Sequence, residues 1–173
     1  VAHSTTPNLQ LGLLRRLLGD QIRTVSRKNL VKGRKFSEML NEALTRYTNR
    51  SLTTAEIIAE LVNLAKDMRA ERERAQQLGL SEAEIALYDA IIQNDSAILE
   101  MGDETLKTIA RELVTTIRSS ATLDWTVKES VRARMRSRIK RLLAKYKYPP
   151  DKREQAVQLV IEQAEHLATG EQD

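Results

Sequence analysis

The residues of this chain that could do chemistry are mainly cationic, and many of them gather in one segment. Residues 128–147 contain nine basic side chains and a single acid, Glu129. On a helical wheel of 100° per residue, the basic side chains fall on two flanks of an apolar stripe. One flank consists of Arg132, Arg136 and Lys140, and the other of Arg134, Arg138, Arg141 and Lys145. Such flanks can hold phosphate groups or an acidic protein surface, because both present anionic oxygens to guanidinium and ammonium groups.

Two interpretations of this segment are open at the level of sequence. In one, the flanks contact the phosphates of duplex DNA or an acidic partner. In the other, the long basic side chains cover neighbouring apolar surface and pair with the acidic residues of 53–120. The chain has one Trp, four Tyr and one Phe, which argues against modules that stack the bases of RNA or of single strands on aromatic rings. The expected core stripe of this helix is Val131, Met135, Ile139, Leu142 and Tyr146.

The constellations that catalysis requires are missing from the sequence. No Gly is followed by Lys, so there is no phosphate-binding P-loop, and the six glycines are too far apart for a dinucleotide fingerprint. No acidic residue has a Lys two positions later, the spacing common in metal-dependent nucleases. Glu162 and His166 have i, i+4 spacing and could share a metal, but we interpret them as a histidine near a helix C-terminus beside a surface acid. We therefore expect no catalytic, cofactor-binding or metal-binding residue and no small-molecule substrate.

Charge is segregated along the chain. The net charge of +4 divides into about +7 for residues 1–52, −6 for residues 53–120 and +3 for residues 121–173. Alternating blocks of this kind imply oriented docking or internal pairing of charges. In the helix expected to begin at Thr53, the polar run 69–74 is expected to extend into water. Our candidate protein-interface residues are Arg69, Arg72, Arg74 and Trp125.

Every stretch with a clear period has the helical one, so the sequence predicts an all-α fold of about seven helices in an irregular bundle, with no sheet. Capping boxes are expected at Thr53 with Glu56 and at Ser81 with Glu84. We expect a polar, disordered segment over residues 1–10, a helical domain over residues 11–168 with a hinge near residues 26–34, and a tail over residues 169–173.

Nothing in the sequence predicts an association with membranes. No apolar stretch approaches the roughly 18 residues that a membrane span requires, and the polar start shows no signal-peptide pattern. The absence of cysteine is consistent with a reducing compartment, and we expect a cytoplasmic location. Because the chain begins with Val1 rather than with Met, we expect it to be a piece of a longer protein.

Five runs of residues are distinctive enough to resemble a known family. They are Arg34-Lys35-Phe36-Ser37-Glu38-Met39-Leu40 followed by Thr45-Arg46-Tyr47-Thr48-Asn49-Arg50; Leu78-Gly79-Leu80-Ser81-Glu82 followed by Leu87-Tyr88-Asp89-Ala90; Met101-Gly102-Asp103-Glu104 followed by Ile109-Ala110-Arg111-Glu112-Leu113-Val114; Asp124-Trp125-Thr126-Val127; and Tyr146-Lys147-Tyr148-Pro149-Pro150-Asp151-Lys152. In this order they resemble the helical C-terminal domain of the R (restriction) subunit of type I restriction enzymes, over about residues 15–168.

The resemblance implies a role in a larger enzyme. In that family, the parent subunit carries a metal-dependent nuclease domain and two helicase-like motor lobes that use ATP and Mg²⁺ to translocate and cleave DNA. The helical domain follows these and docks the subunit onto the methylase (M) and specificity (S) subunits. The family offers no catalytic residue to transfer to this region. The resemblance thus favours a non-catalytic docking domain, and the basic helix 128–147 leaves duplex-DNA phosphate binding as the alternative.

Overall fold

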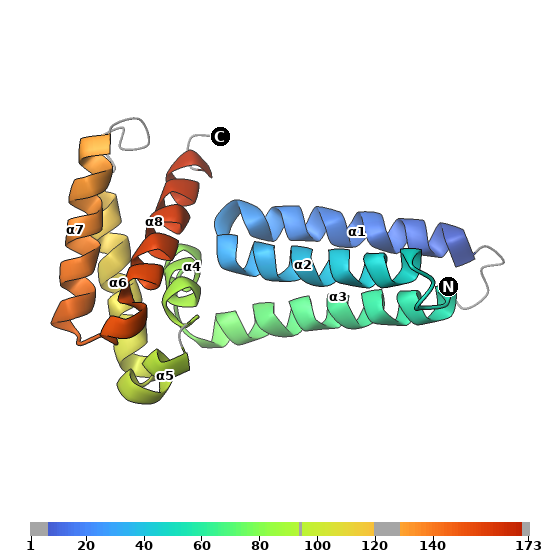
Figure 1. Ribbon diagram of the computed structural model, residues 1–173, viewed down its shortest axis with the longest axis horizontal. Coiled ribbons are helices and arrows are strands. Elements are labelled where there is room, and N and C mark those ends of the chain that lie inside the picture. Colours follow the sequence, from blue (N-terminus) through green and yellow to red (C-terminus); the bar gives the residue numbers. More distant parts are fainter. Residues whose placement is uncertain (1–6, 94, 120–128, 171–173) are drawn as a thin grey trace. The chain divides into compact units, whose positions relative to one another are not determined.

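The computed structural model describes residues 7–93, 95–119 and 129–170, and helices make up nearly all of these ranges (Figure 1). The α-helices are α1 (Pro7–Lys28), α2 (Leu30–Thr48), α3 (Thr54–Gln77), α4 (Glu82–Ile91), α5 (Asp95–Met101), α6 (Asp103–Ser119), α7 (Glu129–Lys145) and α8 (Arg153–Gly170), with a 3₁₀ helix, η1 (Pro150–Lys152), before the last. The described residues contain no strand, which confirms the all-α prediction. Because α1 begins at Pro7, residues 7–10 are helical and the prediction that they belong to a disordered segment is wrong.

The chain divides into two compact units. The described residues of Val1–Ser26 and Lys32–Gly79 form the first unit, and those of Arg27–Val31 and Leu80–Asp173 form the second. The first unit therefore contains most of α1 and α2 together with α3. The second contains α4 to α8 and also the short segment around Asn29 that connects α1 to α2.

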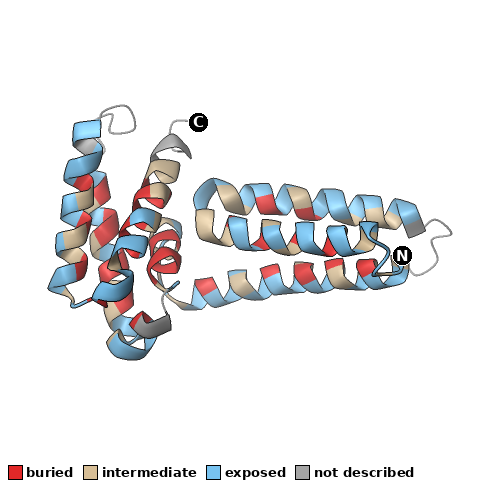
Figure 2. Ribbon diagram, in the orientation of Figure 1, coloured by how far each residue is buried: buried red, intermediate tan, exposed pale blue. Residues whose placement is uncertain are grey.

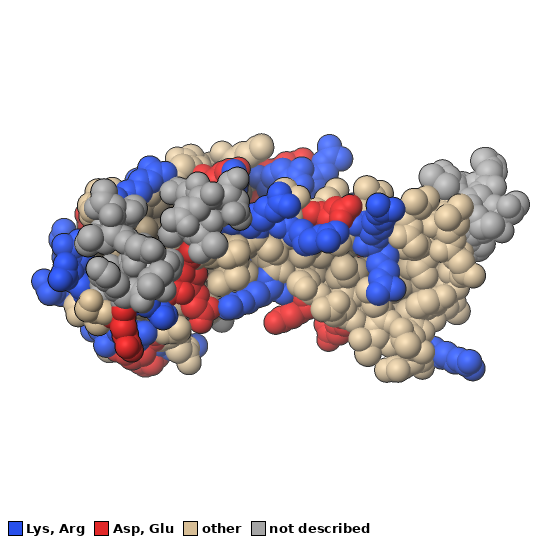
Figure 3. All heavy atoms as spheres, turned by 90° about the horizontal axis from the view of Figure 1, so that it is seen from above, with Lys and Arg blue, Asp and Glu red and all other residues tan. Residues whose placement is uncertain are grey.

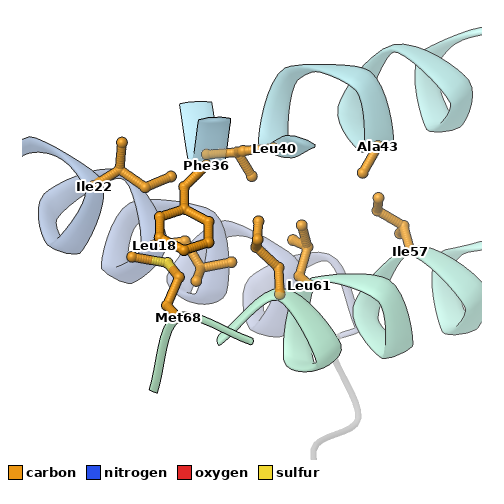
Figure 4. Packing of buried hydrophobic residues seen from close by; sticks show 9 residues of the cluster. Leu18, Ile22, Phe36, Leu40, Ala43, Ile57, Leu61 and Met68 are labelled. Carbon is orange, nitrogen blue, oxygen red and sulfur yellow. The ribbon is translucent and has the colours of Figure 1, made fainter. Parts of the chain in front are cut away.

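The core of the first unit forms where one apolar stripe from each of α1, α2 and α3 meets the other two (Figure 4). Residues three or four positions apart lie on one face of a helix, so each stripe points to the same side along its length. Fully burying a Leu or Phe side chain contributes about 1.5–3 kcal/mol. The buried residues of this core are Leu18, Ile22, Phe36, Leu40, Ala43, Ile57, Leu61, Leu64 and Met68.

Two capping boxes fix the starts of α3 and α4, as the sequence predicted. The Glu56 N–H donates to the Thr53 hydroxyl at 3.2 Å, and the Thr53 N–H donates to the Glu56 carboxylate at 3.1 Å. The same reciprocal bonds join Ser81 and Glu84 at 3.2 and 2.8 Å. Each box satisfies two N–H groups that have no partner within the helix, and thereby sets where the helix begins. Between the two helices, Gly79 has a φ of +71°, a backbone conformation that glycine adopts without strain.

The second unit is built around α4, α6, α7 and α8 (Figures 1 and 2). Helices α6 and α8 each contact both α4 and α7, and α5 lies against α6. Their buried side chains form the core of this unit. These are Ala86, Leu87, Tyr88, Ala90, Ile91, Ala97, Leu106, Ile109, Ala110, Leu113, Val114, Ile117, Met135, Ile139, Leu143, Tyr148, Ala156, Val157, Val160, Ile161 and Ala164.

The core stripe of α7 differs from the predicted one at its C-terminal end, at Leu142 and Tyr146. Met135, Ile139 and Leu143 are buried, whereas Leu142 and Tyr146 are half-buried. The Tyr146 hydroxyl donates to the Glu112 carboxylate at 2.5 Å. The predicted stripe was therefore wrong at Leu142, whose place is taken by Leu143. The side chain of Val131 lies outside the described residues.

The turn between α1 and α2 is short and held by buried polar side chains. Of the hinge that we expected near residues 26–34, only Asn29 lies outside a helix. Asn29 is buried and donates to Asp89 of α4 at 2.7 Å. Gln163 of α8, also buried, accepts from the Leu30 N–H at 2.7 Å and donates to the Lys28 carbonyl at 3.0 Å. These bonds satisfy backbone groups at the end of α1 and at the start of α2.

Among the described helices, none is long and apolar enough to cross a membrane.

Candidate functional site

One flank of the basic helix α7 faces α8 and is neutralised there. Arg132 Nε lies 2.7 Å from the Glu165 carboxylate, and Lys140 Nζ lies 2.8 Å from the Glu154 carboxylate. Between these two ion pairs, Arg136 donates to a side-chain oxygen of α8 at 3.1 Å. This flank therefore contributes to the contact between α7 and α8.

The partners on α8 share one face of their own helix, and the sequence shows that much. Glu154, Gln158 and Glu165 have i, i+4 and i+11 spacing, which places them on one face of a helix. One interpretation of the basic segment was internal pairing with the acidic residues of 53–120, and this flank does pair within the chain. Its partners, however, lie on α8 and not in residues 53–120. The hydrogen bond from Lys140 lowers the pKa of Glu154, helped by the charge of Arg136 and partly opposed by desolvation.

The other flank of α7 borders an open groove beside α6. The groove has a volume of about 410 Å³ and is lined by Thr115, Thr116 and Ser119 of α6 and by Arg138, Arg141, Leu142 and Lys145 of α7. At one end, Lys145 Nζ lies 3.8 Å from the Glu112 carboxylate and 5.2 Å from the centre of the Tyr146 ring. Within the described part of the chain, Arg134 and Arg141 are exposed and make no ion pair or hydrogen bond. The two flanks of one helix thus have different electrostatic surroundings.

The candidate interface residues of α3 lie on a surface of mixed charge. Arg74 forms an ion pair of 2.8 Å with Glu71, and Arg69 lies 3.5 Å from Glu73. Arg72 is exposed. All three arginines lie on α3, and Trp125 lies outside the described residues.

Glu71 is the centre of a cationic cluster in the first unit. Lys32, Lys35 and Arg74 place their cationic nitrogens 3.9, 3.8 and 2.8 Å from its carboxylate. Burial raises the pKa of Glu71, but the hydrogen bond from Arg74 and the charges of the three cations outweigh burial, and the net effect lowers that pKa. This cluster joins α2 to α3 and stabilises the unit in which it lies.

A second apolar stripe on α1 was missed by the sequence reasoning. Leu9, Leu13 and Leu17 are 60, 55 and 58% exposed, and they lie on the side of α1 away from the buried Leu18 and Ile22. Figure 3, which views the molecule from above, shows a mostly uncharged surface over the end of the first unit where α1 begins. The signal was present in the sequence, because three leucines at i, i+4 and i+8 cannot share a face with the core stripe. A helix that is apolar on two faces is normally covered on both.

The described residues contain no group of three or more His, Asp or Glu side chains that could hold a metal ion. Glu162, whose spacing from His166 would allow the two to share a metal, accepts a hydrogen bond from Gln158 at 3.3 Å. Gln158, Glu162 and His166 are spaced four residues apart and therefore lie on one face of α8.

With this geometry, the chain is an all-helical module with two distinctive surfaces, a leucine stripe and a cationic groove. Residues 1–170 match the family described as "Type I restriction enzyme HindI endonuclease subunit-like, C-terminal". The chain belongs to this family, which confirms the resemblance seen in the five sequence runs.

Two relatives agree with this assignment. The chain is 45% identical over 168 residues to the "Type I restriction enzyme HindI endonuclease subunit" of Haemophilus influenzae, covering 97% of this chain and 16% of that protein. It is 37% identical over 136 residues to the "Putative type I restriction enzyme MjaIXP endonuclease subunit" of Methanocaldococcus jannaschii, covering 77% of this chain and 13% of that protein. The chain therefore spans about a sixth or less of the length of these relatives. No solved structure matches it.

Proposed function

We propose that this chain is a non-catalytic docking domain that assembles the R subunit of a type I restriction enzyme onto its methylase (M) and specificity (S) subunits. The parent subunit would supply the ATP- and Mg²⁺-dependent translocation and cleavage of DNA, and this domain would supply its attachment. The family assignment supports the parentage, because both relatives are named as endonuclease subunits of such enzymes.

The observation that carries the docking role is the exposed leucine stripe of α1. Single exposed apolar residues are common on protein surfaces, but three in register on one helix face form a contiguous patch. Patches of this kind mark interfaces, because covering them removes apolar surface from water. Arg16 lies beside the stripe and is exposed, so the surface that covers it should be apolar with an acidic rim.

The test is assembly of the parent subunit after the stripe has been made polar. We expect Leu13→Glu combined with Leu17→Glu to weaken co-elution with the methylase–specificity core at least tenfold. Two exposed side chains are removed from the interface, and each is worth about 1 kcal/mol or more when buried at its centre. Size-exclusion chromatography at low salt, followed by a titration, measures the loss.

The matched control is Ile98→Glu combined with Leu99→Glu. These two residues of α5 are also exposed and apolar, at 44 and 86%, and the change of charge is the same. The control should assemble like the unmodified subunit. Equal assembly of both double variants and the unmodified subunit would contradict the docking role of the stripe.

A further inference from the structure

The groove between α6 and α7 has no part in the docking role argued above. It lies in the second unit, whereas the leucine stripe lies in the first. Its three cations, with Arg134 one helical turn before Arg138, form a row on one flank of α7. We propose that this row binds the sugar–phosphate backbone of duplex DNA. The inference goes beyond the docking role and does not depend on it.

The length of the row favours a polymer over a small anion. Arg134, Arg138, Arg141 and Lys145 span eleven positions, which is about 16 Å at a rise of 1.5 Å per residue. Successive cations are therefore about one helical turn apart, too far for one phosphate to contact all of them. Duplex DNA, with a negative charge for about every 1.7 Å of its axis, offers anionic oxygens along the whole row.

The walls of the groove show which groups can hold a ligand. The Thr115 hydroxyl donates to the Arg111 carbonyl at 3.2 Å, and the Ser119 hydroxyl donates to the Thr116 carbonyl at 2.8 Å. These side chains are small and leave the groove open, and their hydroxyl groups donate to carbonyls of α6 itself. Donors to a bound phosphate come from the cationic side chains of α7. Binding should therefore depend on salt, as contacts of Arg and Lys with phosphate do.

The chemistry of the groove favours a duplex over a single strand. Proteins that hold single strands stack bases on aromatic rings, and the described residues that line this groove include no such ring. The Tyr146 ring, next to Lys145 in the chain, lies beneath the Lys145 ammonium group, and its hydroxyl donates to Glu112. Glu112 also reduces the charge at that end, so Arg134 and Arg141 carry most of the attraction.

The two flanks of α7 provide an experiment with an internal control. In the 173-residue chain, Arg134→Gln combined with Arg141→Gln removes two cations from the groove side. Arg132→Gln combined with Arg136→Gln removes the same charge from the same helix on the side paired with α8. Binding to a fluorescent duplex is measured by anisotropy over a series of salt concentrations, and circular dichroism confirms that both variants are folded.

We expect the groove variant to bind at least tenfold more weakly at 0.1 M salt, and its log–log salt slope to fall by about two because two phosphate contacts are lost. The control variant should change affinity by less than threefold and keep its slope. Equal losses in both variants, or no loss in the groove variant, would overturn the proposal. Competitors distinguish the ligands: unlabelled duplex should displace the probe, whereas displacement by inorganic phosphate or polyglutamate at the same ionic strength would overturn a duplex-specific site.

Discussion

Gln163 of α8 accepts a hydrogen bond from the backbone N–H of Leu30 at 2.7 Å, and its amide donates to the Lys28 carbonyl at 3.0 Å. One fully buried side chain thus hydrogen-bonds to the backbone on both sides of Asn29, the single non-helical residue between α1 and α2. Backbone groups that lose contact with water and have no hydrogen-bond partner lower the stability of the fold. We therefore expect Gln163 to stabilise the turn between α1 and α2.

Replacing Gln163 should destabilise the chain markedly. We expect Gln163→Leu to lower the free energy of unfolding by about 1–3 kcal/mol, because the Leu30 N–H and the Lys28 carbonyl, both part-buried, lose their side-chain partner. Urea denaturation followed by circular dichroism measures the change. Gln155→Leu on the same helix is the control, since Gln155 is exposed, and it should change the stability by less than about 0.5 kcal/mol. A Gln163 variant as stable as its control would contradict the assigned role.

The two glycines Gly33 and Gly19 should respond in opposite directions to the same substitution. A Cβ at Gly33 would lie 2.8 Å from the Ser26 Cα, so backbone would have to shift, whereas a Cβ at Gly19 meets nothing within 4 Å. We expect Gly33→Ala to destabilise the first unit by about 1–3 kcal/mol through overpacking. Gly19→Ala, in the interior of α1, should stabilise it by about 0.5–1 kcal/mol. Thermal unfolding compares the two, and a gain in stability at Gly33 would contradict the close approach of α1 and α2.

Glu71 should make the stability of the first unit sensitive to acid. Its pKa is lowered in the folded chain, so its contribution is fully present above the pKa of an unfolded glutamate, about 4.3, and is lost as the pH falls through the lower folded value. Glu71→Gln should therefore reduce the loss of stability between about pH 5 and pH 3. Glu73→Gln, which changes a more exposed acid two residues along α3, is the control. Denaturation curves are measured at several pH values for both variants. If stability changes with pH in the same way in both, the cluster around Glu71 does not contribute to the sensitivity to acid.

Local rules predicted much of the fold. The capping boxes at Thr53 and Ser81, the stripes of the first unit and the buried face of α8 all follow from spacing along one helix. The error at Leu142 arises because Leu142 and Leu143 are equally apolar, and only the position of α6 and α8 decides which one is buried. Spacing within a helix contains no information of that kind.

The candidate sites were predicted less completely, for a related reason. Both flanks of α7 look equally cationic in the sequence, and the pairs of Arg132 with Glu165 and of Lys140 with Glu154 depend on where α8 lies. The contact with α8 therefore supplies ion-pair partners to the flank of Arg132 and Lys140, and spacing along α7 alone does not show this. The exposed leucines of α1 were overlooked because apolar residues were assigned to the core, although α1 has two apolar faces.

The central claim, that this chain attaches a restriction subunit to its partners, is tested most directly by competition. The 173-residue chain is titrated into the methylase–specificity core with labelled parent subunit already bound. A docking domain should displace the parent subunit in a saturable way, and the Leu13→Glu/Leu17→Glu form should displace it at least tenfold less well. Failure of the unmodified, folded chain to displace the parent subunit at low salt would contradict the account.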